Sequence, residues 1–143
     1  MSEQPINLHR ENWAYLQNSN FFNQHENVAF FMWMFNLDDY NRIVTKNGKL
    51  ADIKDLAQLG NITFDQTKKF VKKLQDHGFI MTVMLGDTKE RFYLVNPNLA
   101  FVTFYDKWLR TFEEDFKKME QSGFLKDLPV SVWDDDVFEI REG

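Results

Sequence analysis

The sequence contains no cysteine, and only three prolines and six glycines stand among its 143 residues. The absence of cysteine excludes a disulfide scaffold, a zinc-thiolate site and a cysteine nucleophile. The longest apolar block, Val28 to Phe35, is much shorter than the roughly 20 residues that a transmembrane helix requires. No apolar run follows a basic flank at the N-terminus, so no signal peptide is visible. We therefore expect a soluble cytoplasmic protein without a membrane segment.

Aromatic residues are in surplus, with 15 Phe and 4 Trp. A chain of this size can bury only some of them, so part of the aromatic surface is expected to contact a partner. The net charge of −5 is unevenly distributed. Residues 41–97 hold 10 Lys/Arg and 6 Asp/Glu, a local charge of +4, and the rest of the chain carries −9. This segregation favours a DNA-facing module between acidic flanks. The alternative is that the lysines only solvate a helix face.

The segment 50–97 predicts a helix, a tight turn, a second helix and a two-stranded hairpin. Asp52 is a suitable N-cap for the first helix, and Gly60-Asn61 is suited to end it. The capping-box pattern Thr63 to Gln66 predicts the start of the second helix, and His77-Gly78 predicts its end. This order of elements is typical of a winged helix-turn-helix, an α+β fold whose second helix usually enters the major groove of DNA.

The remaining segments give less regular signals. A uniformly apolar stretch predicts a buried first helix over 25–36, Asn47-Gly48 predicts a tight turn, and residues 12–22 fit either a strand or a helix. Helical periodicity from Phe101 to Gln121 predicts one long aromatic helix. We expect an N-terminal extension over 1–23, a winged-helix domain over 24–102, an amphipathic helix over 103–123 and an acidic tail over 124–143.

The second helix is the predicted DNA reader. Phe64, Phe70, Val71 and Leu74 are expected to face inward and the lysines outward, where they suit phosphate contacts. Gln66 has the amide that can pair with adenine, whereas no arginine lies on this face, which disfavours strict sequence specificity. The hairpin tip is expected to touch the DNA backbone or minor groove. The predicted DNA-binding residues are Thr63, Asp65, Gln66, Lys68, Lys69, Lys72, Lys73, Lys89 and Arg91.

Three stretches carry a family resemblance: Gly48-Lys49-Leu50 running into 53–57, Leu74 with 77–80, and 94–101 after the hairpin. They resemble winged-helix proteins of phages and plasmids of Gram-positive bacteria, including RepL-like replication initiators and MarR-like regulators. The resemblance covers residues 28–102. It implies binding of double-stranded DNA, with the second helix in the major groove, through Thr63, Asp65, Gln66, Lys68, Lys69 and Lys72.

Two features leave alternatives open. The aromatic stripe of the C-terminal helix either packs as core or forms a dimer seam, and the acidic tail either is a solvated end or covers the lysines. Asp65, an acidic residue in the helix predicted to read DNA, and the excess aromatic surface favour a second function. In this second function the chain is a phage-encoded module that binds a host replication, transcription or defence protein.

No nucleotide loop, nucleophile elbow or metal-ligand spacing is present, so we expect neither enzymatic activity nor a metal or cofactor. The aromatic stripe of the predicted C-terminal helix, which is the candidate dimer or partner interface, comprises Phe104, Trp108, Phe112 and Phe116.

Overall fold

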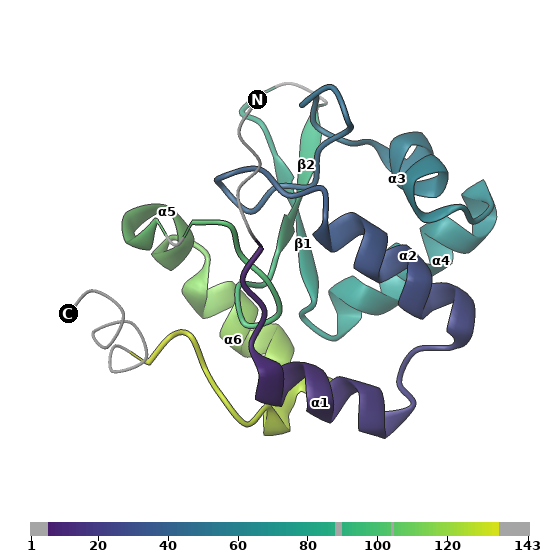
Figure 1. The fold of residues 1–143 in the computed structure, drawn as a ribbon. Coiled ribbons are helices and arrows are strands. Elements are labelled where there is room, and N and C mark those ends of the chain that lie inside the picture. The colour runs from purple at the N-terminus through teal and green to yellow at the C-terminus, as the bar shows by residue number, and fades with distance from the viewer. Residues whose placement is uncertain (1–5, 88–89, 104, 135–143) are drawn as a thin grey trace.

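The computed structural model describes residues 6–87, 90–103 and 105–134. Within these residues the chain is an α+β fold with six α-helices and one antiparallel hairpin (Figure 1). The elements are α1 (Arg10–Ser19), α2 (Gln24–Met34), α3 (Ile53–Gly60), α4 (Phe64–Asp76), β1 (Ile80–Met84), β2 (Arg91–Val95), α5 (Asp106–Arg110), α6 (Glu113–Gln121) and a final 3-10 turn, η1 (Phe124–Asp127).

Strand β2 lies at the centre of the fold. On one edge it pairs with β1, with Ile80 opposite Val95 and Met84 opposite Arg91. On the other edge it meets the segment 41–44, where the Ile43 amide donates to the Tyr93 carbonyl at 3.0 Å. Because β2 has neighbours on both edges and both faces, every residue of it except Arg91 is buried.

The two faces of β2 belong to different cores. Tyr93 and Val95 pack into the larger core with α1 to α4, whereas Phe92 and Leu94 pack with the C-terminal elements. Figure 1 accordingly places α2, α3 and α4 on one side of the hairpin and α5 and α6 on the other. The alternation follows from the two-residue period of a strand.

The prediction of one long C-terminal helix was wrong, because the helix is broken between Arg110 and Glu113. Tertiary contacts outweigh the helical periodicity of this segment. Trp108 turns its indole N–H to the Tyr40 carbonyl at 2.8 Å, while Phe116 is completely buried beside Trp133. The predicted helix over 25–36 is confirmed as α2, and the ambiguous segment 12–22 is largely the helix α1.

Residues 124–134, which were predicted to lie in an acidic tail, contain side chains that pack on the fold. Leu125, Val132 and Trp133 are buried at 2%, 0% and 3% exposure, so the chain remains part of the fold as far as Trp133. The sequence of this segment does not indicate which elements its apolar side chains pack against, because those elements are distant in the chain. Residues 135–143 lie outside the described residues, and the idea that they cover the lysines stays a prediction.

A buried polar network joins four parts of the chain. The carboxylate of Glu120 on α6 accepts hydrogen bonds from the side-chain amides of Asn96 at 2.6 Å and Asn98 at 2.8 Å. The carbonyl of Asn98 accepts from the Asn12 side chain of α1 at 2.9 Å, and its side-chain oxygen accepts from the Val132 amide at 2.6 Å. None of the four polar side chains is more than 9% exposed. Each hydrogen bond therefore compensates for lost hydration.

Gly60 brings α3 against α2, and we expect Gly60→Ala to destabilise the fold. A Cβ at this position would lie 2.8 Å from the Cβ of Ala29 and 3.1 Å from Nε1 of Trp33. Overpacking of this kind usually costs about 1–3 kcal/mol, which exceeds the roughly 1 kcal/mol that alanine contributes as a better helix former. Urea unfolding measures the difference. Adding Ala29→Gly should recover part of the loss, and equal stability of Gly60→Ala and wild type would contradict the close contact.

Candidate nucleic-acid interface

Helices α3 and α4 are joined by a tight turn that the sequence encodes at each end. Asp52 accepts a hydrogen bond from the Asp55 amide at 2.8 Å and begins α3, and Asn61 ends it in the left-handed region with φ of 54°. Thr63 accepts from the Gln66 amide at 3.1 Å and begins α4. The indole of Trp33 on α2 donates to the Leu56 carbonyl at 2.9 Å, which fixes α3 on the core. Both predicted helix starts are confirmed.

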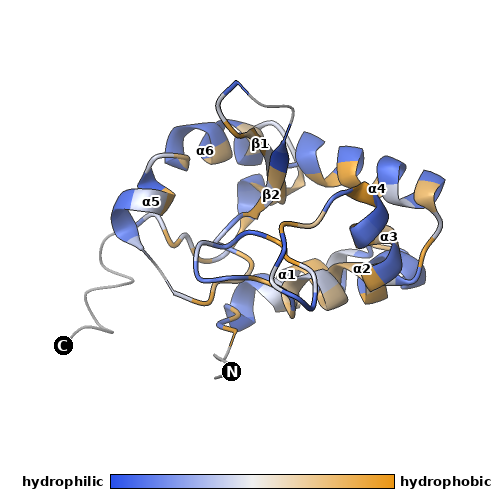
Figure 2. Ribbon diagram, turned by 90° about the horizontal axis from the view of Figure 1, so that it is seen from above, coloured by the Kyte–Doolittle hydropathy of each residue, from blue (hydrophilic) through white to orange (hydrophobic). Residues whose placement is uncertain are grey.

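Helix α4 has one buried and one exposed face. Thr67, Phe70, Val71 and Leu74 are buried, as expected from their spacing. Figure 2 shows the resulting alternation of hydrophilic and hydrophobic bands along α4. The opposite face exposes the predicted stripe of Asp65, Lys68, Lys69 and Lys72. We call Lys68, Lys69 and Lys72 the α4 lysines.

Two residues of α4 face differently from the prediction. Phe64 was expected to be inside but is 45% exposed, and the Lys68 ammonium lies 5.5 Å from its ring centre. Lys73 was expected to be a DNA contact, but its ammonium donates to Glu26 at 2.9 Å and to the Phe21 carbonyl at 2.8 Å. Lys73 therefore ties α4 to the start of α2. Lys73 can make these contacts because it lies at the edge of the polar face of α4, where a long side chain can turn back onto the core.

The side chains of Thr63 and Gln66 are engaged with each other's backbone. The Gln66 side-chain oxygen accepts from the Thr63 amide at 2.9 Å, which completes the capping box. A bidentate contact with adenine needs both that oxygen and the amide nitrogen, so Gln66 could make it only by giving up its cap. The role predicted for Gln66 therefore conflicts with its structural role.

The hairpin lies beside the C-terminal half of α4. The Thr82 hydroxyl of β1 donates to the Gln75 side-chain oxygen of α4 at 2.9 Å. Arg91 opens β2 at an exposed position near the hairpin end, as predicted. Lys89 lies outside the described residues, so its predicted role as a contact is not addressed. Among the described residues of the hairpin, Arg91 is therefore an exposed cation near the hairpin end.

The start of α3 carries the clearest pKa shift near this surface. The hydrogen bond from the Asp55 amide lowers the pKa of Asp52, burial opposes this, and the side chain of Asp55 and the charge of Lys49 lower the pKa further. A carboxylate whose pKa is depressed on folding stabilises the fold above its unfolded pKa. This contribution is lost as the pH falls through the folded pKa, so the cap of α3 weakens in acid.

The predicted partner stripe on the C-terminal helix is largely core. Phe116 is fully buried, and Trp108 and Phe112 are half-buried against the core that contains Phe92. Of the two interpretations of this stripe, internal packing therefore holds for Phe116. Phe104 lies outside the described residues.

Four of the exposed large apolar residues lie together on α2 and at its C-terminal end. Val28, Phe31, Met32 and Phe35 are 54%, 43%, 41% and 60% exposed, although the sequence predicted this helix to be buried. They follow i, i+3, i+4, i+7 spacing and so share one face. We call these four residues the α2 stripe. Sequence reasoning missed it because every residue of α2 from Val28 onward is apolar, and periodicity then does not show which side faces solvent.

Comparisons were made with protein-family models, curated proteins and solved structures. None matches the chain. The resemblance to RepL-like and MarR-like proteins therefore stays a prediction. Among the described residues, no helix has the length and apolar character to span a membrane, and no group of His, Asp and Glu is arranged to hold a metal ion.

Proposed function

We propose that the chain is a winged helix-turn-helix protein that binds double-stranded DNA as a regulator or replication accessory. The order α2, segment 41–44, α3, α4 and hairpin supports this, because it supplies a helix-turn-helix followed by a wing. The segment 41–44 lies along the free edge of β2 through an isolated bridge between Arg42 and Leu94 and the hydrogen bond from Ile43 to Tyr93.

The observation that carries the proposal is the exposure of the α4 lysines on one face. Lys68, Lys69 and Lys72 are all solvent-exposed, and only Lys72 forms an ion pair within the described residues, with Asp76 at 3.0 Å. Such a surface pair is worth about 0–1 kcal/mol, so a phosphate can displace Asp76 at little cost. Lysines of this kind supply sequence-independent, salt-sensitive affinity.

A salt titration tests the proposal directly. A mixed-sequence duplex, followed by fluorescence anisotropy, should bind at low salt, and log K should fall linearly with log salt. With three lysines and Arg91 on phosphates, the expected slope is roughly −3 to −4. Absence of binding at low salt would reject the proposal.

The second candidate function is a module that binds a host protein, and the exposed α2 stripe is the observation that favours it. Contiguous exposed apolar surface marks interaction sites in soluble proteins. This second function would be supported if the chain did not bind DNA at low salt and bound a partner protein through the α2 stripe.

A further inference from the structure

The α2 stripe is a preformed aromatic surface. The rings of Phe31 and Phe35 stack with centres 5.0 Å apart, and Trp13 of α1 contacts Phe31 at 5.7 Å. Side chains held in this way lose little conformational freedom when they are covered, and buried aromatic residues are the usual anchors of protein interfaces.

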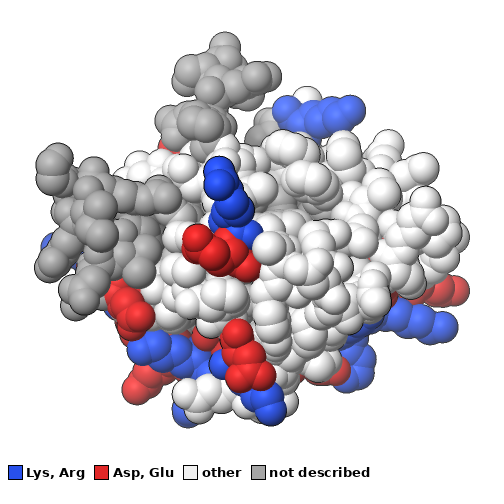
Figure 3. Space-filling view, turned by 60° about the horizontal axis from the view of Figure 1, so that its bottom comes forward, with Lys and Arg blue, Asp and Glu red and all other residues white. Residues whose placement is uncertain are grey.

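The surface around the stripe is almost free of charge. Across α1 and α2 the charged residues are Arg10, Glu11 and Glu26, and Glu26 is already paired with Lys73 at 2.9 Å. Figure 3 shows the side of the molecule on which α1 lies, where most of the surface is uncharged, one basic and one acidic side chain lie near the middle, and the other charged side chains lie toward the edges. A second copy could therefore approach α2 without repulsion between like charges at the centre of the contact.

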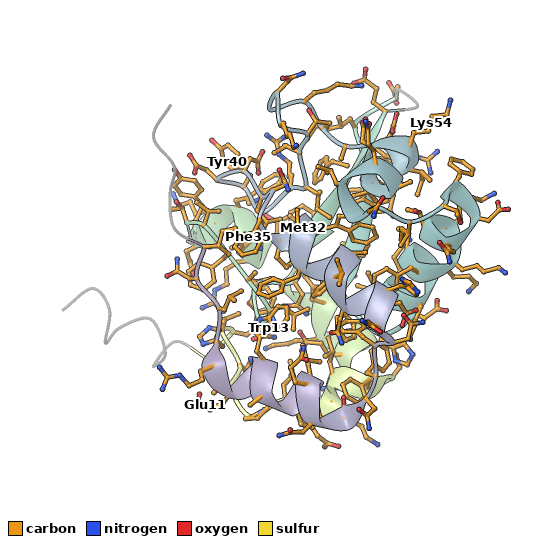
Figure 4. The ribbon with its side chains drawn as sticks, turned by 45° about the vertical axis from the view of Figure 1, so that its right-hand side comes forward. Glu11, Trp13, Met32, Phe35, Tyr40 and Lys54 are labelled. Carbon is orange, nitrogen blue, oxygen red and sulfur yellow. The ribbon has the colours of Figure 1, made fainter. Side chains whose placement is uncertain are left out.

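The few charges at the ends of this face are complementary. In Figure 4, Glu11 and Lys54 lie at opposite ends, with Trp13, Met32 and Phe35 between them. Glu11 and Lys54 are both exposed, and neither forms an ion pair in the described part of the chain. A two-fold axis through the middle of the stripe would bring Glu11 of each copy toward Lys54 of the other, because the contacts of such a dimer are reciprocal.

The area of the stripe fits a dimer of ordinary size. With about 200 Å² taken for each of the four side chains, the exposed fractions give the α2 stripe on the order of 400 Å² of apolar surface. A standard interface covers about 800 Å² per partner, of which roughly 450 Å² is apolar. Half-buried neighbours such as Trp13 and Leu59 supply the difference.

We propose that this face joins two copies of the chain across a two-fold axis, with the α2 stripe of each copy packed on that of the other and Glu11 paired with the partner's Lys54. The inference does not depend on DNA binding. Complexes with interfaces of this size have Kd values from about micromolar downward, so the full chain should sediment with twice the 17.2 kDa chain mass at about 100 μM.

Phe35→Glu tests the apolar centre of the dimer. Phe35 is the most exposed member of the stripe, and a charge there should weaken dimerisation at least about 30-fold in sedimentation equilibrium. Met84→Glu is the matched control, since Met84 is 53% exposed on β1 and should leave the dimer intact. Circular dichroism and thermal unfolding check that both variants are folded. A monomeric wild-type chain, or a Phe35→Glu chain that dimerises like wild type, would overturn the proposal.

Charge exchange tests the two-fold arrangement itself. Glu11→Lys and Lys54→Glu should each weaken the dimer, because each homodimer then contains two pairs of like charges. Mixing the two variants should restore association, since both pairs in the mixed dimer are attractive. The same restoration is expected for the double variant with both changes. If the mixture associates no better than either variant alone, the Glu11–Lys54 pairing, and with it the proposed dimer, is rejected.

Discussion

The double variant Lys68→Glu with Lys72→Glu is expected to lose at least about 100-fold in affinity for duplex DNA at low salt. Two favourable phosphate contacts are replaced by two repulsive charges, and each tenfold loss corresponds to about 1.4 kcal/mol. Both residues are exposed and neither belongs to the buried face of α4, so the fold should be unaffected. Anisotropy titrations at several salt concentrations should also show a shallower slope.

The control for this variant is Lys107→Glu with Lys118→Glu, which changes the net charge by the same amount on α5 and α6. Both lysines are exposed and lie on elements that pack on the opposite side of the hairpin from α4 (Figure 1). This control should bind DNA with only a small loss. Equal losses in the two double variants would mean that overall charge, and not α4, governs binding, and full affinity in the α4 variant would place the contact elsewhere.

The variant Glu120→Ala is expected to lower the free energy of unfolding by about 3 kcal/mol. The change removes the acceptor of Asn96 and Asn98 and leaves buried donors without a partner, and each such donor costs roughly 1–3 kcal/mol. Trp133 also donates to the same carboxylate oxygen, at 3.4 Å. Urea unfolding followed by tryptophan fluorescence measures the loss.

Two further variants separate the network from the helix that carries it. Glu120→Gln keeps a side-chain oxygen that can accept from an asparagine, so it should lose less stability than Glu120→Ala. Glu114→Ala changes an exposed carboxylate on α6 and should stay within about 0.5 kcal/mol of wild type. A loss after Glu120→Ala no greater than that after Glu114→Ala would show that the buried bonds contribute little net stability.

Local signals predicted α3, α4 and the tight turn between them well. The caps at Asp52 and Thr63, the left-handed Asn61 and the glycine after α4 act within a few residues of each other, so a single sequence contains the information. The buried residues of α4 were predicted correctly for the same reason, with the exception of Phe64 at the first position of the helix.

The features that were missed depend on distant contacts. The break before α6 arises from packing between Trp108 and Tyr40, and the burial of Trp133 depends on Glu120 and Phe116. The role of Lys73 depends on Glu26, which is 47 residues away in the chain. Helical periodicity and residue propensities do not encode these pairings, because the pairings form only when the helices and strands pack together.

Strand β2, one of the two strands of the proposed wing, is held between two cores. Residues 92–95 are buried on both faces, and the strand is bonded along both edges. Its amide protons should therefore exchange with solvent only through large-scale unfolding. The base of the hairpin is thus already in place before any ligand arrives, and association would require little ordering of the chain there.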